Sequence, residues 1–385
     1  MSILAEIPAV DPVIHHVTAM ITPERALRYL RAIADTLAPS QTAWQTRAPV
    51  VEQLLRDDGV LARPHVAFTR NYRQTGDAVL LLGPNEQKSV WLLTHLDICA
   101  YVIEPFTDGC YPLTPVSYHL MQPGRRPGTA LRYNIDAGHL EVAAQGMIET
   151  RDDGAIGFCP DGPVTLAPGC RVVFQSMLDH EMSSGVVRGN VDDAAGVTAH
   201  LLAAAVLSQY GVNVLVAMTD EEEGVAGTGN QSICRGGKRV LRYFDQPELV
   251  IVTDIHETIP MADGHGPDNL RPGDGAVYVE KSSAGKGGIT PPHLYAFQRR
   301  LAEELSPAGI SLCENHGGYA SRSECVNAME RTPNVALLGF LGTNRHFDTD
   351  LPSANLHDIV HLARALVLYV LSTQTPTWRR TMGSD

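Results

Sequence analysis

Acidic and histidine residues recur in this chain where apolar segments end. Val-Trp-Leu-Leu-Thr leads into His95 and Asp97, and Val-Leu-Val-Ala-Met-Thr leads into the acidic run 220–223. Val-Ile-Val-Thr leads into Asp254, and a longer apolar segment ends shortly before His346. Histidine and carboxylate side chains are the ligands of hydrolytic metal sites. The set is large enough for two divalent ions, if the fold brings its members together.

Continuous apolar segments are typical of buried parallel strands, and in open α/β sheets ligands bind at the carboxyl ends of the strands. Apolar periodicity predicts helices at 22–37, 48–58, 194–209, 292–306 and 355–372, and strands at 212–219, 248–254, 275–280 and 334–341. This alternation predicts an α/β fold with a mostly parallel, doubly wound sheet and helices on both faces. Such a sheet would gather the acidic and histidine residues at one edge.

Residues 99–187 differ in character from the rest of the chain. Short alternating segments such as 131–135 and 171–174 lie between Gly/Pro turns, which predicts a small all-β module. We therefore expect a catalytic domain built from residues 1–98 and 188–385, interrupted by a small β domain at 99–187. The polar residues from Thr373 onward are expected to form a loose tail.

Composition restricts the classes of partner and the compartment. The formal net charge is −13, which disfavours nucleic acid and anionic membrane surfaces as partners. Apolar segments are of strand length or interrupted, and the N-terminus lacks the pattern of a signal peptide. The seven cysteines contain no Cys-x-x-Cys pair, which predicts reduced thiols and a cytoplasmic location.

The paired acids Asp192 and Asp193 precede a helical pattern. One aspartate suffices to cap a helix N-terminus, so the second is available to coordinate, and a carboxylate with two oxygens can bridge two cations. Asp97 lies two residues after His95, on the same side of an extended segment, and can orient the imidazole. A strand-end residue such as Asp254 is an ordinary cap unless it joins such a group.

The acidic run 220–223 is hard to explain without a cation, unless it forms a solvated turn, because four neighbouring carboxylates repel one another. In a metal site two adjacent glutamates would divide the work: one would bind metal, and the other would act as general base on the attacking water. His346 is the least secure ligand, since Asp348 or His357 could take its place in that segment.

The order His-x-Asp, Asp-Asp-x-x-Gly, Glu-Glu-x-Gly, strand-end Asp and His resembles that of the co-catalytic zinc exopeptidase superfamily. The long extra segment between His95 and Asp192 is similar in position to the small β domain of the tetrahedral aminopeptidases, which include glutamyl and deblocking aminopeptidase-like proteins. Residues 317–321 lie where that branch has a Gly-Gly-Thr-Asp-Ala-like motif. The resemblance implies self-association through the β domain.

The resemblance also implies roles for individual residues. One metal would be held by His95, Asp192 and Asp254, and the other by Asp192, Glu222 and His346, with Glu221 as general base and Asp97 behind His95. The glutamate pair could be placed one residue later. However, Glu221-Glu222-x-Gly224 keeps the family glycine in register, which favours the earlier placement. Zinc is the expected metal, with cobalt or manganese as alternatives.

The expected activity is hydrolysis of a peptide bond at the N-terminal residue, where a carboxylate on the pocket rim, Glu223 or Glu257, would attract the free ammonium. The sequence departs from the family pattern at Ala194 and 319–320, and in the segment around His346, which leaves the substrate open.

Two alternatives therefore remain. In a small-molecule amidohydrolase or N-acyl amino acid deacylase, Arg322 or Arg345 would clamp a substrate carboxylate and His316 would donate to an oxyanion. In the second alternative, the chain is a non-catalytic relative of these enzymes.

Overall fold

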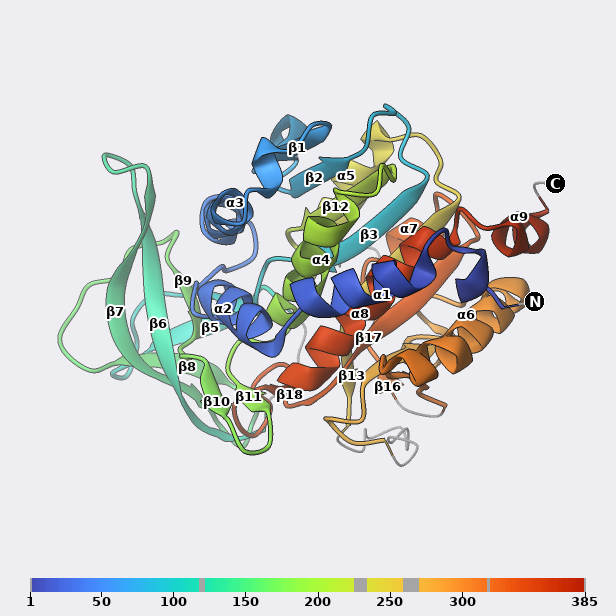
Figure 1. Cartoon of the computed structure of the whole chain (residues 1–385). Helices are drawn as coiled ribbons and strands as arrows, with labels where there is room; N and C mark the ends of the chain where they lie inside the picture. Colours follow the sequence, from blue (N-terminus) through green and yellow to red (C-terminus); the bar gives the residue numbers. More distant parts are fainter. Residues whose placement is uncertain (1, 118–121, 225–233, 259–269, 317–318, 384–385) are drawn as a thin grey trace.

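A mixed β-sheet runs through the centre of the protein in the computed structural model, which describes residues 2–117, 122–224, 234–258, 270–316 and 319–383 (Figure 1). Its strand order is β1 (Val66–Thr69), β2 (Ala78–Leu82), β12 (Val214–Thr219), β3 (Val90–His95), β13 (Leu249–Glu257), β17 (Val335–Thr343), β18 (Ser353–Asn355), β11 (Val186–Arg188) and β10 (Asp179–Glu181). Off this path, β14 (Ala276–Val279) pairs with β17 and β15 (Leu312–Glu314), and β16 (Tyr319–Ala320) pairs with β13.

Parallel pairing is concentrated in the middle of the sheet. Strands β12, β3, β13 and β17 are parallel neighbours, and β14 and β15 form a further parallel pair. The other pairs, at both edges, are antiparallel. The expectation of a mostly parallel sheet is thus corrected to a mixed sheet. Short connections such as those between β1 and β2 and between β10 and β11 suit antiparallel neighbours, whereas parallel neighbours need a long crossover.

Helices lie on both faces of the sheet but are distributed unequally, and all the helices predicted from the sequence lie on one face (Figure 1). One face carries α1 (Val10–Met20), α2 (Pro23–Ala34), α3 (Arg47–Asp57), α4 (Ala194–Leu207), α6 (Pro292–Leu305), α8 (Leu356–Ser372) and α9 (Pro376–Met382). The other carries α5 (Arg235–Val240) and α7 (Cys325–Ala328). Short 3-10 helices are η1 (Leu4–Glu6), η2 (Val60–Ala62), η3 (Tyr72–Gln74), η4 (Leu241–Tyr243), η5 (Ser283–Gly285) and η6 (Ser306–Ala308).

Side chains of the central strands alternate between the two apolar cores. In β3, Leu92 packs toward α4 and α8, while Trp91 and Leu93 pack toward α5 and α7. Helix α4 is buried on every side, because it lies between the sheet and helices α2 and α8. Burial on all sides fixes the axis of this helix. The carboxylates that precede its N-terminus are therefore held in a defined place.

The C-terminal segment is ordered, contrary to the expected loose tail. Helix α9 places Trp378 in the core, where its ring lies 5.1 Å from that of Phe297 in α6. Few residues of this segment are apolar, so the sequence showed no helical periodicity that would have predicted α9. Within the described ranges, no single helix is long and apolar enough to cross a membrane, and α8 with α9 meets that test only as a pair bent by 80°.

A closed barrel forms a separate unit at the end of the molecule away from both chain termini (Figure 1). Its strand order is β4 (Ala100–Ile103), β5 (Tyr111–Pro115), β8 (Ile156–Pro160), β7 (His139–Thr150), β6 (Gly124–Asn134) and β9 (Arg171–Phe174). It encloses its own apolar core around Phe158 and Phe174. Strands β10 and β11, which the sequence analysis assigned to the insert, pair with the main sheet instead.

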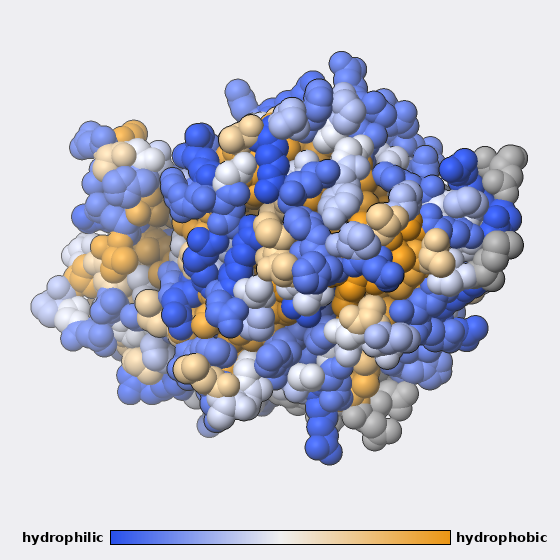
Figure 2. Space-filling model, viewed as in Figure 1, coloured by the Kyte–Doolittle hydropathy of each residue, from blue (hydrophilic) through white to orange (hydrophobic). Residues whose placement is uncertain are grey.

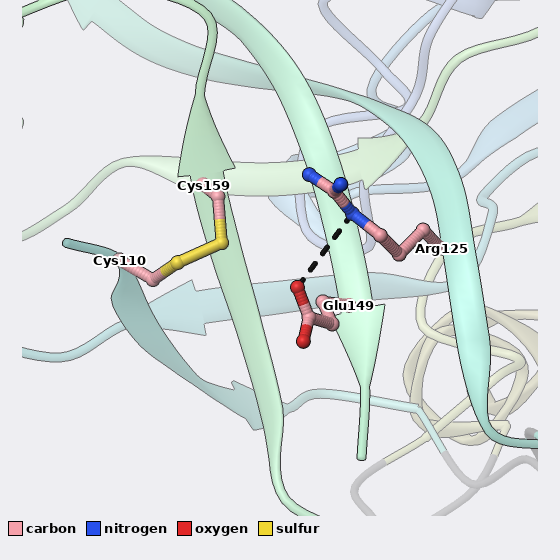
Figure 3. Close-up of a disulfide and its surroundings, with 4 residues drawn as sticks. All are labelled: Cys110, Arg125, Glu149 and Cys159. Carbon is pink, nitrogen blue, oxygen red and sulfur yellow. Dashed lines mark ion pairs between the residues drawn. A yellow bond between two sulfur atoms is a disulfide. The ribbon is translucent and has the colours of Figure 1, made fainter. Parts of the chain in front are cut away.

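A disulfide joins Cys110 and Cys159 in the barrel, with a Cα–Cα distance of 4.4 Å (Figure 3). Beside it, Arg125 and Glu149 form an ion pair of 3.6 Å across the β6–β7 pair. The expectation that the cysteines are reduced is therefore wrong for this pair. The two cysteines lie 49 positions apart in the sequence, and no motif there indicated that they pair. The cytoplasmic location stays a prediction, without the support that the cysteines were expected to give it.

We expect the double variant Cys110→Ser/Cys159→Ser to lose about 2–4 kcal/mol of unfolding free energy, because the cross-link restricts the unfolded chain. Urea denaturation followed by circular dichroism measures this loss. Under strong reductant the wild-type protein should fall to the stability of the variant. Equal stability of both proteins under oxidising conditions would contradict the prediction.

Candidate metal centre

The carboxyl ends of the central parallel strands and the N-terminus of α4 meet at one edge of the sheet. His95 ends β3, Asp254 lies in β13, and Asp192 precedes α4. One possible ligand atom from each of these three buried side chains lies within 4.8 Å of the other two. The structure thus brings together three residues that the sequence placed in one group. Asp254 is inside its strand rather than at its end, since β13 continues to Glu257.

Asp97 holds the imidazole of His95 from behind. The Nδ1 atom of His95 lies 3.5 Å from Asp97 Oδ1 and 3.2 Å from the Asp97 carbonyl oxygen, while its Nε2 atom faces Asp192 Oδ1 at 3.1 Å. Asp97 is fixed in turn by Ser40 Oγ, which donates to its Oδ2 at 2.5 Å, and by the Glu222 backbone N–H, at 3.1 Å from its Oδ1. This arrangement leaves Nε2 of His95 to face the group.

The two neighbouring aspartates before α4 have separate partners. Asp193 caps the helix, because its Oδ1 accepts from the Gly196 N–H at 3.0 Å, and it also accepts a hydrogen bond from Thr94. Asp192 instead directs both oxygens into the site: Oδ1 lies 3.1 Å from His95 Nε2, and Oδ2 lies 3.7 Å from His346 Nε2. The peptide bond between them is cis. One aspartate thus caps the helix and the other is placed to coordinate.

In the acidic run after β12, Glu222 and Glu223 face the site, whereas the sequence analysis preferred the pair Glu221 and Glu222. Glu221 has a φ of 58° and forms ion pairs with Arg239 at 2.6 Å and Arg235 at 3.5 Å. Glu222 faces His95, with 4.0 Å between its Oε2 and the histidine Nε2. Glu223 faces His346, with 3.3 Å between its Oε2 and the histidine Nε2. The arginine partners hold Glu221 at the α5 side, so the adjacent glutamates that face the site are 222 and 223.

A second group of possible ligands forms beside the first. It contains Cys99, Glu223 and His346, all buried, each with one possible ligand atom within 4.8 Å of the others. His346 is therefore the residue of its segment that joins the site. Of the two alternatives, His357 lies at the start of α8 beside Gly185, and the backbone carbonyl of Asp348 accepts a hydrogen bond from Arg126.

Burial and like charges dominate the electrostatics of this edge. Burial raises the pKa of Asp254 to about 7 and that of Glu222 well above its usual value. Burial alone would lower the pKa of His95, but Glu222 and the neighbouring aspartates raise it well above its ordinary value. Burial would likewise raise the pKa of Glu223, but His346 and His95 lower it to about 2. The folded chain thus gathers several buried carboxyl groups around the two imidazoles.

The donor set fits divalent cations. Carboxylate oxygens and imidazole nitrogens are borderline to hard ligands of the kind that zinc, cobalt and manganese accept. Buried carboxylates that repel one another are stabilised by a cation between them, and Asp192 offers one oxygen to each group. Each of the two groups is therefore suited to a divalent cation.

Three residues of the site were not found by sequence reasoning. Arg47 is fully buried, donates to the Leu96 carbonyl at 2.9 Å and brings a positive charge near Asp97 and Asp192. Burial lowers the pKa of Arg47 to about 10, although the aspartates counteract this. Ser40 holds Asp97, and Cys99 lies in the second group. They lie in helix or loop segments without a ligand motif, so no pattern distinguished them.

Arg345 borders a small pocket next to the second group. This pocket is also lined by Asp192 and Glu223 and by two aromatic rings, Phe174 of β9 and Phe347, which stack at 4.5 Å. The Arg345 side chain donates to Ser321 Oγ at 2.8 Å. The barrel thus contributes a wall of the site.

Glu257, expected on the pocket rim, is buried, and its Oε2 accepts from the Arg345 backbone N–H at 3.4 Å. His316 is exposed, with its Nδ1 atom 3.4 Å from Glu314 Oε1, and the two glycines that follow it lie outside the described residues. Arg322 is half-buried beside Gly287. The substrate roles expected for these three residues stay predictions.

Similar folds occur among solved structures, whereas no family model and no curated protein matches the sequence. The TET1 peptidase of Pyrococcus horikoshii, which assembles into a tetrahedron or an octahedral shell, has a TM-score of 0.66 and 16% identity over 90% of this chain and 99% of its own. A TET aminopeptidase from a marine sediment thaumarchaeote has a TM-score of 0.68 and 13% identity, over 90% of this chain and 96% of its own. An aminopeptidase of Desulfurococcus kamchatkensis has a TM-score of 0.68 and 15% identity, over 94% of this chain and 98% of its own. The predicted resemblance to the tetrahedral branch is confirmed for the fold.

We expect Ser40→Ala to weaken zinc binding by about 10- to 100-fold, because the carboxylate that orients His95 loses its hydroxyl partner. Isothermal titration of the metal-free protein with zinc measures the change. Gln41→Asn, which alters the next residue, is the matched control. It keeps the backbone N–H that donates to Asp220 Oδ1 at 2.8 Å, and asparagine tolerates the left-handed backbone at this position. Equal affinities of wild type and Ser40→Ala would refute the positioning role.

Proposed function

We propose that this chain is a metal-dependent hydrolase of amide bonds, and specifically an aminopeptidase with two adjacent divalent ions. The observation that carries the proposal is the position of Asp192, which belongs to the group of His95 and Asp254 and turns its second oxygen toward His346 of the other group. With two cations bound, a carboxylate placed in this way would help to hold both. The fold shared with aminopeptidases supports the same class of reaction.

One ion would be held by His95, Asp192 and Asp254, and the other by Asp192, Glu223 and His346. Zinc is the first choice, with cobalt or manganese as alternatives. When bound, the ions supply Lewis acidity that polarises the scissile carbonyl and lowers the pKa of water. The chain itself contributes the convergent carboxylates, the fixed orientation of His95 through Asp97, and the exclusion of bulk water by burial.

Glu222 is our candidate for the general base, in place of Glu221. Its Oε2 atom lies 4.0 Å from His95 Nε2, at the edge of the first group, whereas Glu221 is paired with Arg239 and Arg235. A carboxylate in this position would take a proton from the attacking water. The same carboxyl group would then deliver that proton to the leaving amine.

The substrate we propose is a peptide with a free N-terminus, in keeping with the aminopeptidases that share the fold. One structural feature favours a second candidate. Arg345 borders the pocket beside Asp192 and Glu223, and a guanidinium group there is suited to a substrate carboxylate. An N-acyl amino acid would present that carboxylate, so deacylation remains the alternative to test.

We further propose that the protein self-associates. The Pyrococcus horikoshii peptidase with this fold assembles into large shells. On the barrel of the present chain, Tyr133, Ile135 and Val142 expose apolar side chains on or beside the β6–β7 hairpin. Apolar surface is visible on this end of the molecule in Figure 2. Exposed apolar patches of this kind mark contact surfaces.

Single substitutions of Glu221 and Glu222 show which of the two residues is the general base. Glu222→Gln should keep the bound metal and lower kcat by about 10²- to 10⁴-fold, because the proton acceptor is lost. Glu221→Gln is the matched control, with the same change one residue away, and should keep kcat within a few-fold. Kinetics with elemental analysis of both variants measures this. The opposite result, with Glu221→Gln inactive and Glu222→Gln active, would restore the earlier assignment.

A substrate panel tests the reaction class. We expect aminoacyl-arylamides to be hydrolysed and N-acyl amino acids to be left intact, with activity removed by a chelator and restored by zinc. Release of the arylamine and of free amino acid is followed for each compound. Cleavage confined to blocked substrates would favour the deacylase, and activity unaffected by full metal removal would refute the metal-dependent reaction altogether.

A further inference from the structure

We infer that Cys99 is a thiolate ligand of the second ion, beside Glu223, His346 and Asp192. This inference rests on the proposed function and adds a sulfur ligand to a centre that the sequence suggested was built from histidine and carboxylate alone. Cys99, Glu223 and His346 are buried, and one possible ligand atom of each lies within 4.8 Å of the other two. Cys99 is 5% exposed.

The backbone around Cys99 is held on both sides. The preceding Ile98 donates its N–H to the Ala38 carbonyl at 2.9 Å and forms a parallel β-bridge with Pro39. The following Ala100 begins β4 and pairs with Val173 of β9. The thiol is therefore presented from the junction of the sheet and the barrel. A ligand on a fixed backbone needs little reorganisation to bind a cation.

The surroundings of Cys99 are those of a ligand rather than of a core residue. A buried cysteine usually packs as a small apolar side chain. Here the thiol hydrogen-bonds to Glu223 and borders the pocket that Asp192 and Arg345 also line. The sulfur thus faces the charged side of the pocket, next to the imidazole of His346.

Thiolate ligation would make the two ions unequal. The Cys99 thiol releases its proton to solvent as the ion binds, and the sulfur–metal bond forms without a redox step. Four side chains would then hold the second ion, whereas three side chains, those of His95, Asp192 and Asp254, would hold the first. Substrate would then approach the first ion. A soft sulfur ligand also favours zinc or cobalt over manganese at the second position.

Cobalt spectroscopy tests the ligand directly and does not depend on turnover. The full-length protein is stripped of metal and loaded with Co²⁺, and the near-ultraviolet band of thiolate-to-cobalt charge transfer is recorded. We expect the wild-type protein to show this band and Cys99→Ser to lose it. Two matched controls should keep it: Cys313→Ser, whose sulfur donates to the Asp274 carbonyl at 3.7 Å, and Cys234→Ser, whose sulfur lies 3.5 Å from Glu222 Oε1.

The outcomes separate this inference from the proposed function. Two bound cobalt ions without the band, or a band lost in Cys234→Ser and kept in Cys99→Ser, would overturn thiolate ligation by Cys99 and leave the metal centre intact. Failure to bind any cobalt or zinc would overturn both. Should Cys99→Ser not fold, X-ray absorption of the zinc-loaded wild type decides: a sulfur shell at about 2.3 Å supports the inference, and nitrogen and oxygen shells alone refute it.

Discussion

The structure depends on holding several buried carboxylates around Asp192 against their mutual repulsion. Removing charged groups from water is costly unless they are paired, and the imidazoles of His95 and His346 and the guanidinium of Arg47 offset part of that cost. The N-terminus of α4 adds a favourable dipole for the aspartates that precede it. Cations that bind this edge would relieve the remaining repulsion, so metal binding and folding stability should be coupled.

Connections between distant segments keep the carboxylates convergent. Asp220 accepts from the backbone N–H groups of Gln41 and Ala43, at 2.8 and 2.9 Å, while Ser40 donates to Asp97. One loop thereby ties the end of β12 to the segment after β3. On the other side, the barrel supports the segment around His346 through the stacking of Phe174 on Phe347. The insert is thus part of the wall of the site as well as a separate fold.

Much of this arrangement was predictable from periodicity. The central strands and the long helices α4, α6 and α8 begin and end within three residues of the predicted bounds, because buried parallel strands and long helices have strong apolar patterns. Strands β18, β11 and β10 at one edge, helix α9 and the Cys110–Cys159 disulfide were not predictable in this way. Each depends on partners distant in the sequence, which short-range patterns do not specify.

The sequence by itself determined which kinds of side chain meet at the sheet edge, since strand ends and helix starts are local features. The resemblance of its motifs to a known superfamily also suggested that two metals would share Asp192, which stays a prediction. Only the tertiary structure decided how the acidic run is used: Arg239 of α5 holds Glu221, so Glu222 and Glu223 face the histidines. The same is true of Cys99, which joins a group of possible ligands because the barrel and sheet meet there. Side-chain direction in an irregular turn depends on contacts that no local pattern encodes.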